Sequence, residues 1–302
     1  MFDPLAAGHR HALPSLAATI ELLKPITWFA PMWAYACGAI SSGADLGARW
    51  PYLLAGVLLA GPLVCGTSQA VNDWYDREVD AINEPHRVIP SGRMPGRWGL
   101  YIAIANTALS LLVAALLGPF VLGAAALGLL LAWMYSAPPW RLKRSGWIGP
   151  GAVGLCYEGL PWFTATAAAI GGFPGWPLVA IALLYSIAAH GIMTLNDFKS
   201  VEGDRQMGLA SLPARLGVDP AARLACAVMA LPQLLVIVLL LGWEFRWHAL
   251  IVTFLLAGQA LLMPRLLRDP LRHAAWYNAT GTTLFVLGMM ASAFALRALA
   301  TA

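Results

Sequence analysis

The chain has 302 residues, of which 59% are hydrophobic and only 11% are charged. A soluble domain normally carries about 25% charged residues, so this composition lacks the polar surface that a water-soluble globule needs. It argues against a soluble enzyme and predicts a protein whose solvent is lipid. The net charge of +4 does not indicate nucleic-acid binding, because the Lys and Arg residues are spread over short loops.

The N-terminal segment precedes the first long apolar run. It carries charged residues and histidines between residues 3 and 11, and no cleavage-like site follows an apolar stretch, so no signal peptide is expected. Leu16, Ile20 and Leu23 then recur at i, i+4 and i+7 before Lys24 and Pro25. This spacing predicts a short amphipathic helix that lies on the membrane surface.

Nine stretches are apolar and long enough to be read as spans, because a helix needs roughly 20 mostly apolar residues to cross a bilayer. They are residues 26–43, 51–71, 99–117, 119–136, 147–169, 176–195, 222–241, 247–264 and 275–296. The weakest division falls between the third and fourth, where only Gly118 and Pro119 mark a turn. No soluble segment interrupts the series, so residues 1–302 are expected to form a single all-α polytopic membrane domain.

The connections between these stretches alternate in length and in charge. The short connections at 44–50, 118–119, 170–175 and 242–246 hold only two basic residues, Arg49 and Arg246. The long connections hold the remaining basic clusters, including those around Arg87, Lys143 and Arg205. The positive-inside rule therefore places the N-terminus and the long loops in the cytoplasm, and the C-terminus outside.

The four cysteines lie singly within apolar stretches, at Cys37, Cys65, Cys156 and Cys226. None forms a CxxC pair, so neither a zinc site nor a disulfide framework is indicated. We expect them to act as small buried packing residues.

An acidic motif ends the second apolar stretch. Asp73, Asp76 and Asp80 fall at i, i+3 and i+7, so a helix would carry all three carboxylates on one face, together with Asn72. Like charges at these spacings repel, and the macrodipole disfavours anions at a helix C-terminus by roughly 0.3–1 kcal/mol. A divalent cation between the carboxylates removes both penalties, and Mg²⁺ suits carboxylates together with phosphate oxygens. The alternative is a solvated helix end that is neutralised by arginine in a salt-bridge mesh.

A second motif ends the sixth apolar stretch, where Asn196 and Asp197 repeat the Asn–Asp pair of the first. Asp197 and Asp204 keep the i, i+7 relation, but Ser200 occupies the intermediate position. A hydroxyl is a weaker metal ligand than a carboxylate, so this half is expected to hold metal less strongly. The repetition indicates two halves of one site.

Basic residues follow both motifs. Arg87 and Arg93 lie in a turn-rich loop after the first, and Lys199 and Arg205 lie within or beside the second. Guanidinium groups bind phosphate oxygens bidentately, so these residues are candidates for holding a diphosphate. The alternative for each is a topology charge at the cytoplasmic surface.

These motifs resemble the UbiA superfamily of intramembrane prenyltransferases, whose two aspartate-rich motifs bind Mg²⁺–prenyl diphosphate. The match narrows to the chlorophyll and bacteriochlorophyll synthase branch on the segments DAINEPHRVIPSG (80–92) and NDFKSVEGDRQMGLASLP (196–213). The pair Lys199–Ser200 is typical of this branch, and the segment WFAPMWAYACGAISSG (28–43) is most similar to the bacteriochlorophyll members of the branch. His86 departs from the pattern, in which an aspartate is more usual.

The resemblance implies a fold, a reaction and a set of roles. The fold is a UbiA-type bundle of nine transmembrane helices with cytoplasmic cap loops, in the inner (photosynthetic) membrane of a bacterium. The reaction is esterification of the propionate of bacteriochlorophyllide by geranylgeranyl or phytyl diphosphate, with Mg²⁺ as cofactor and Mn²⁺ as a substitute. Other pigment-biosynthesis or photosystem-assembly proteins are the implied partners. The implied metal ligands are Asn72, Asp73, Asp76, Asp80, Asn196, Asp197 and Asp204; the diphosphate-binding residues are Asn72, Arg87, Arg93, Asn196, Lys199 and Arg205; and the catalytic residues are Asp73, Asp76, Asp197 and Lys199.

Several other functions stay open. A chlorophyll synthase, or a relative that prenylates a quinone precursor or haem, is the nearest alternative. A secondary transporter would place its binding groups near the bilayer midplane, whereas these acids cluster at one surface. A pigment-binding protein would need several intramembrane histidines, and only His190 is well placed. His190 and the intramembrane Glu158 are further candidates for function.

Overall fold

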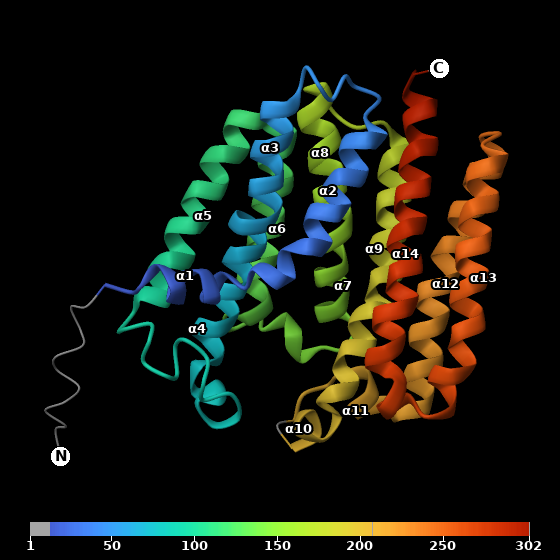
Figure 1. Cartoon of the computed structure of the whole chain (residues 1–302). Coiled ribbons are helices and arrows are strands. Elements are labelled where there is room, and N and C mark those ends of the chain that lie inside the picture. Colours follow the sequence, from blue (N-terminus) through green and yellow to red (C-terminus); the bar gives the residue numbers. More distant parts are fainter. Residues whose placement is uncertain (1–12, 207, 302) are drawn as a thin grey trace, which may run out of the picture.

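The computed structural model describes residues 13–206 and 208–301, which form helices joined by turns (Figure 1). Within these residues, the only β-structure is an isolated bridge between Ser145 and Ala210. The α-helices are α1 (Leu16–Leu23), α2 (Phe29–Ser41), α3 (Trp50–Leu58), α4 (Gly66–Asn83), α5 (Trp98–Leu117), α6 (Pro119–Ser136), α7 (Ile148–Gly154), α8 (Leu160–Ile170), α9 (Trp176–Asn196), α10 (Val201–Gln206), α11 (Leu212–Leu216), α12 (Val218–Gly242), α13 (Arg246–Arg268) and α14 (Pro270–Thr301). The 3₁₀ segments are η2 (Pro25–Trp28), η4 (Leu142–Arg144) and η6 (Asp197–Lys199), and the π-helical segments are η3 (Leu59–Cys65) and η5 (Leu155–Gly159).

Among the described residues, seven helical stretches are long and apolar enough to cross a membrane. They are Trp50–Asn83, Trp98–Leu117, Pro119–Ser136, Trp176–Lys199, Val218–Gly242, Arg246–Arg268 and Pro270–Thr301. The two other predicted spans are helical but fall short, so nine spans are not confirmed. Helix α2 has 13 residues, or about 20 Å at 1.5 Å per residue, against a hydrocarbon core of about 30 Å. The run α7–η5–α8 is less apolar because it contains Glu158 and several aromatic and proline residues.

The long basic connections gather at one end of the bundle. Figure 1 shows loops 84–97 and 137–147 at the same end as α10 and α11, with the C-terminus at the opposite end. The turn at Gly118 ends α5 one residue before α6, as predicted. The connection between the last two predicted spans is a tight turn rather than a long loop, because α13 reaches Arg268 and α14 begins at Pro270. The predicted location of the N-terminus concerns residues 1–12, which lie outside the described part of the chain.

Helix α1 matches the predicted amphipathic helix. Ser15 caps it by accepting a hydrogen bond from the backbone N–H of Ala18 at 3.1 Å. Leu16 and Ile20 are exposed, whereas Ala18 and Leu22 are buried against the bundle. The exposed apolar face is the one that an interfacial helix presents to lipid.

Two features show how the helices pack. A Cβ at Gly38 of α2 would lie 2.1 Å from the backbone carbonyl oxygen of Trp162, so only glycine allows α2 and α8 to approach this closely. Between α12 and α13, the side chains of Gln233 and Gln259 exchange two hydrogen bonds of 3.0 Å, although both residues are buried. The four cysteines are free, as predicted.

Candidate functional site

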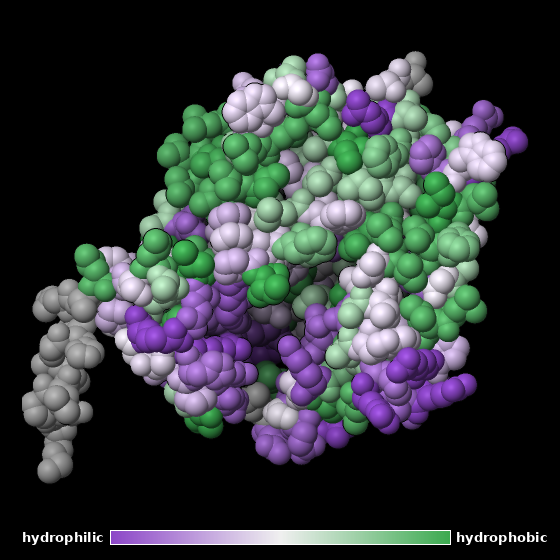
Figure 2. Space-filling model, viewed as in Figure 1, coloured by the Kyte–Doolittle hydropathy of each residue, from purple (hydrophilic) through white to green (hydrophobic). Residues whose placement is uncertain are grey.

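A cavity of about 490 Å³ lies between the two halves of the bundle. Figure 2 shows it as a hollow with hydrophilic side chains at its rim and a largely hydrophobic surface above it. Its polar end is formed by Asn72, Lys143, Asn196, Asp197, Lys199 and Ser200, and its apolar residues include Leu59, Ala60, Ala124, Ala125, Gly128 and Pro161. The cavity therefore joins Asn72 of the first motif to the second motif, which begins 124 positions later at Asn196, whereas Asp73, Asp76 and Asp80 do not line it.

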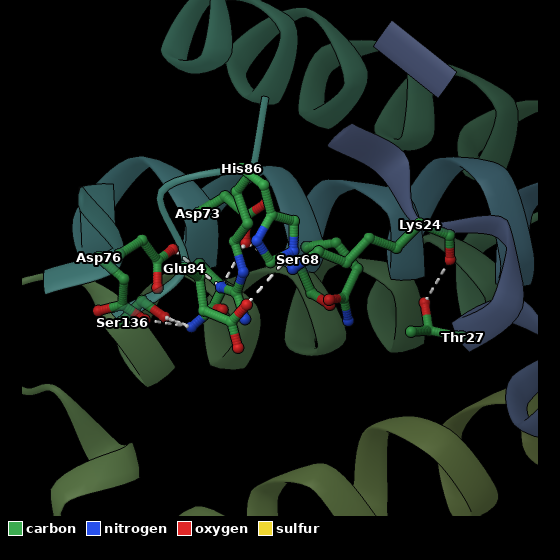
Figure 3. A network of polar contacts seen from close by, with 12 residues as sticks. Lys24, Thr27, Ser68, Asp73, Asp76, Glu84, His86 and Ser136 are labelled. Atoms are coloured by element: carbon green, nitrogen blue, oxygen red, sulfur yellow. Dashed lines mark hydrogen bonds and ion pairs between the residues drawn. The ribbon is translucent and has the colours of Figure 1, made fainter. Parts of the chain in front are cut away.

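Helix α4 carries the first motif as a single uninterrupted helix to Asn83, so the predicted common face is confirmed. Asn72 donates a hydrogen bond to Asp76 Oδ2 at 2.9 Å and another to Ser136 Oγ on α6 at 3.1 Å. Asp73 and Asp80 are buried, at 2% and 7% exposure. Asp73, Asp76 and Ser136 are labelled in the polar network of Figure 3.

Each carboxylate of this motif is paired with a cation of the chain. Lys24 Nζ lies 2.5 Å from Asp73 Oδ1, and in Figure 3 the Lys24 side chain extends along α4 toward it. Lys143 pairs with Asp76. Arg87 Nη1 lies 2.8 Å from Asp80 Oδ2 and 3.5 Å from Asp73 Oδ1.

This pairing corrects one step of the sequence argument. The crowding of aspartates does not by itself require a metal, because Lys24, Lys143 and Arg87 neutralise it. The alternative to a metal site, a salt-bridge mesh at the helix end, is therefore present, and Lys24, Lys143 and Arg87 belong to it. Arg77 pairs with the neighbouring Glu78 at 3.2 Å and lies over the ring of Trp74.

The second motif begins where α9 ends. Asn196 accepts a hydrogen bond from Asn278 Nδ2 of α14 at 2.6 Å. Asp197 and Lys199 line the cavity from η6. Among the described residues no group donates a hydrogen bond to the Asp197 carboxylate, and its backbone carbonyl accepts from Ser200. Asp197 is therefore the acidic side chain that faces the cavity without a neutralising partner.

Asp204 has a different setting. It is buried at 7% exposure and does not line the cavity. Its Oδ2 accepts hydrogen bonds from Ser211 Oγ at 2.6 Å and from Ser200 Oγ at 3.3 Å. The structure thus places it behind Ser200.

Three of the predicted phosphate-binding residues, Arg87, Arg93 and Arg205, do not line the cavity. Arg93 forms a bidentate pair with Glu21 of α1, with Nη2 at 2.7 Å from Oε1, and its hydrogen bonds lower the pKa of Glu21. Arg205 is exposed, and its guanidinium is 4.0 Å from Glu202. Their role toward a diphosphate stays a prediction.

The two intramembrane candidates are buried and lie outside the cavity lining. Glu158 Oε2 and His190 Nε2 have no hydrogen-bond partner among the described residues. His190 Nδ1 is 3.4 Å from Thr194 Oγ1, and its ring lies 5.4 Å from that of Trp147. Because neither side chain lines the cavity, the structure gives no reason to assign a substrate or metal to Glu158 or His190.

The donor atoms around the cavity fit a hard divalent cation. Amide and carboxylate oxygens of Asn72, Asn196 and Asp197 face it, and Mg²⁺ prefers such oxygen ligands. No group of three His, Cys, Asp or Glu side chains in the described segments is close enough to hold a metal. The aspartates of the first motif are instead paired with lysine and arginine. A bound cation would therefore take the place of the chain's own cations.

Sequence reasoning missed several of the residues that build this site. In the sequence, Lys24 lies at the end of the predicted surface helix, Lys143 lies in a basic loop, and Asn278 belongs to neither motif. In the wall of the cavity, the hydroxyl oxygen of Tyr157 accepts from Gln69 Nε2 at 3.1 Å. Lys24 gives no local signal, because a lysine that flanks an apolar stretch is normal under the positive-inside rule.

Comparison with known proteins shows the family of the chain. The model of the UbiA prenyltransferase family matches residues 25–289. The chain belongs to the UbiA prenyltransferase family. The predicted resemblance is thereby confirmed, and the chain is a helical membrane protein with the fold of that family.

Within this family, the chain is more similar to bacteriochlorophyll synthases than to a plant chlorophyll synthase. The bacteriochlorophyll synthase 33 kDa chain of Cereibacter sphaeroides is 59% identical over 96% of this chain and 96% of that protein. Its counterpart in Rhodobacter capsulatus is 55% identical over 95% of this chain and 96% of that protein. The chloroplastic chlorophyll synthase of Avena sativa is more distant, at 37% identity over 91% and 75% of the two chains.

A solved structure supports the fold. A UbiA homologue from Archaeoglobus fulgidus, bound to GPP and Mg²⁺, superposes with a TM-score of 0.68 at 21% identity and covers 89% of this chain and 99% of that one. At this identity the likeness concerns the fold of the UbiA family.

Proposed function

We propose that this chain is a bacteriochlorophyll synthase, which joins the propionate of bacteriochlorophyllide to a geranylgeranyl or phytyl group and releases diphosphate. The observation that carries the proposal is the cavity, because Asn72 of the first motif and Asn196, Asp197 and Ser200 of the second line its polar end, while much of its wall is apolar. Such a cavity suits a molecule with a charged head and a hydrocarbon tail. The acceptor is inferred from the bacteriochlorophyll synthases, to which the chain is 59% and 55% identical.

The charged head would be held by the cations that now neutralise the first motif. Lys24, Arg87 and Lys143 carry flexible side chains that can exchange a carboxylate partner for a diphosphate oxygen. Lys199 lines the same end of the cavity.

The metal would be held by the oxygens of the two motifs, Asn72, Asp73, Asp76 and Asp80 on one side and Asn196 and Asp197 on the other. A bound Mg²⁺ supplies charge stabilisation for the departing diphosphate. Binding of the metal to these carboxylates would free Lys24, Arg87 and Lys143 to pair with the diphosphate, so binding of the metal and binding of the diphosphate would be linked.

The chain's own contribution to the chemistry is positioning and exclusion of water. The acceptor carboxylate is already ionised at neutral pH, so no strong general base is needed. The apolar wall that continues from Leu59 and Ala60 keeps water from the allylic carbon, where it would compete with the carboxylate. Gln69 lies three residues before Asn72 on α4 and donates a hydrogen bond to Tyr157 of η5, and both residues line the cavity.

The membrane arrangement belongs to the same proposal. We infer that α2 and the run α7–η5–α8 also cross the bilayer, which gives nine crossings within one domain. The loops around Arg87, Lys143 and Arg205 then face the cytoplasm, and the C-terminus faces outward. A reporter fused after the last residue, active only outside the cytoplasm, tests this orientation.

The test of function uses membranes that contain the full chain. They are incubated with bacteriochlorophyllide or chlorophyllide, with geranylgeranyl or phytyl diphosphate, and with Mg²⁺, Mn²⁺ or EDTA; the esterified pigment is separated by chromatography. We expect esterified bacteriochlorophyll in the presence of Mg²⁺ and none with EDTA. Esterification of chlorophyllide alone, or of a quinone precursor or haem, would overturn the choice of acceptor.

A matched pair of variants ties the activity to the site. Asp197→Asn removes the carboxylate that faces the cavity and should abolish transfer. Asp219→Asn makes the same change at an exposed position at the start of α12 and should leave transfer unchanged. Equal turnover by both variants would remove Asp197 from the mechanism.

A further inference from the structure

Ser200 is the residue by which the second motif departs from three evenly spaced aspartates, and it lines the cavity. Its hydroxyl Oγ is 3.3 Å from Asp204 Oδ2 and 3.2 Å from the backbone carbonyl oxygen of Asp197. Both neighbours are acceptors. The single hydroxyl proton is therefore directed at the protein, and the lone pairs of Oγ remain available.

This orientation decides what Ser200 can bind. A hydroxyl whose proton is engaged cannot donate a hydrogen bond to a diphosphate oxygen, but it can ligate a cation. Neutral oxygen ligands are normal for hard divalent cations, alongside at least one carboxylate. Asp197, three residues earlier, supplies that carboxylate at the same end of the cavity.

Asp204 is fixed in the position from which it orients Ser200. Its Oδ2 also accepts a hydrogen bond of 2.6 Å from Ser211, which is buried. The backbone around it is tied on both sides, because Asp204 N–H donates to the Ser200 carbonyl and Leu209 N–H donates to the Asp204 carbonyl, each at 2.8 Å.

The segment is also anchored to the first half of the molecule. Ala210 N–H donates to the Arg144 carbonyl at 3.1 Å, and Gly146 N–H donates to the Ala210 carbonyl at 2.9 Å. A Cβ at Gly146 would lie 2.6 Å from that Ala210 oxygen, so the contact is close. The loop that carries Ser211 is thus held against the loop that carries Lys143.

This setting differs from that of the first motif. There the aspartates are paired with long cationic side chains, which a divalent cation can replace. Asp204 is paired with two short neutral hydroxyls, and replacing them would leave a buried Ser211 hydroxyl without a partner, which is unfavourable.

We propose that Ser200 Oγ, rather than the Asp204 carboxylate, is the cation ligand that completes the second motif beside Asn196 and Asp197. Asp204 is then a positioning residue, which holds the hydroxyl proton and turns the lone pairs toward the cavity. This assignment rests on the proposed function only in requiring a divalent cation at the site. It gives the second half one carboxylate and two neutral oxygens, a ligand set of lower charge than that of the first.

The test uses sulfur as a selective ligand. Ser200→Cys is compared with Ser211→Cys, because both serines contact Asp204 but only Ser200 lines the cavity. The purified full-length variants are titrated with Cd²⁺ in the presence of inorganic diphosphate, and the cadmium–thiolate absorption in the ultraviolet is recorded. The four native cysteines are common to both variants and cancel in the difference.

We expect Ser200→Cys to gain one equivalent of cadmium–thiolate absorption and about a tenfold preference for Cd²⁺ over Mg²⁺ relative to the parent chain, because thiolates favour soft cations. Ser211→Cys should gain neither. The same absorption in Ser211→Cys, or none in a folded Ser200→Cys, would overturn the assignment.

A second pair of variants addresses the role of Asp204. Asp204→Asn keeps an acceptor for the serine hydroxyls, so its Mn²⁺ affinity, measured by electron paramagnetic resonance, should stay within a few-fold of the parent. Ser200→Ala should weaken it about tenfold, as expected for the loss of a metal ligand. Loss of Mn²⁺ binding in Asp204→Asn with normal binding in Ser200→Ala would reverse the two roles. Normal cation binding without transfer to bacteriochlorophyllide would reject the proposed acceptor and leave this ligand set intact.

Discussion

The ion pair between Lys24 and Asp73 lends itself to a quantitative prediction. Asp73 is 2% exposed, and Lys24 Nζ is 2.5 Å from its Oδ1. Lys24→Met keeps the aliphatic length of the side chain and removes the charge. The empty protein is then left with a buried carboxylate whose nearest remaining cation is Arg87, at 3.5 Å.

The expected loss of stability follows from these distances. Removing one partner of a fully buried pair typically costs about 3–5 kcal/mol. The cost is lower here because the Lys24 side chain is 24% exposed and Arg87 compensates in part. We therefore expect about 2 kcal/mol, or close to a thirtyfold change in the folding equilibrium.

Denaturant unfolding in micelles measures this loss, with the fluorescence of the 13 tryptophans as the signal. Asp73→Asn in the Lys24→Met background removes the unpaired charge and should restore most of the stability. Lys199→Met is the matched control, because Lys199 has no ion-pair partner in the described part of the chain. A Lys24→Met protein as stable as the parent, or a double variant no more stable than the single one, would refute the reasoning.

Three further predictions concern packing and the hydrogen bonds around the site. Gly38→Ala should lower the free energy of unfolding by about 1–3 kcal/mol, because the new methyl group meets the backbone of α8. Gly123→Ala is the control: its methyl group would face open space, so stability in the same unfolding assay should not change. Asn278→Leu removes the 2.6 Å hydrogen bond to the second motif and should raise the KM for prenyl diphosphate several-fold, with a smaller effect on kcat, as steady-state kinetics will show. Gln233→Leu leaves Gln259 buried without its partner and should cost about 1–3 kcal/mol of unfolding free energy, while leucine at both positions should restore it.

Much of the fold follows from local sequence signals. The hydropathy pattern predicts the long helices because each must bury its backbone polar groups within itself and present apolar side chains to lipid. The spacing of Asp73, Asp76 and Asp80 predicts their common face, because it depends only on the helical repeat. The capped amphipathic helix at Leu16–Leu23 is predictable for the same reason.

The features that escaped prediction depend on distant parts of the chain. Lys24 and Lys143 lie 49 and 67 positions from the aspartates that they neutralise, and no local pattern connects them. The role of Ser211 depends on a loop that returns to Asp204. The end of helix α2 at Ser41 is likewise not predictable, because apolar composition does not indicate where a helix ends.

The lysines on the first motif have a consequence for how the protein is made. A metalloprotein whose site is built of bare charges must acquire its ion in order to fold, as small zinc domains do. Here Lys24 and Lys143 already fill that electrostatic role, so the chain can be inserted, assembled and stored before its ion arrives. Under the proposed function, a cell short of magnesium would then keep the protein in its membrane at full abundance and lose only its turnover. Recovery would be as fast as ion uptake, without new synthesis.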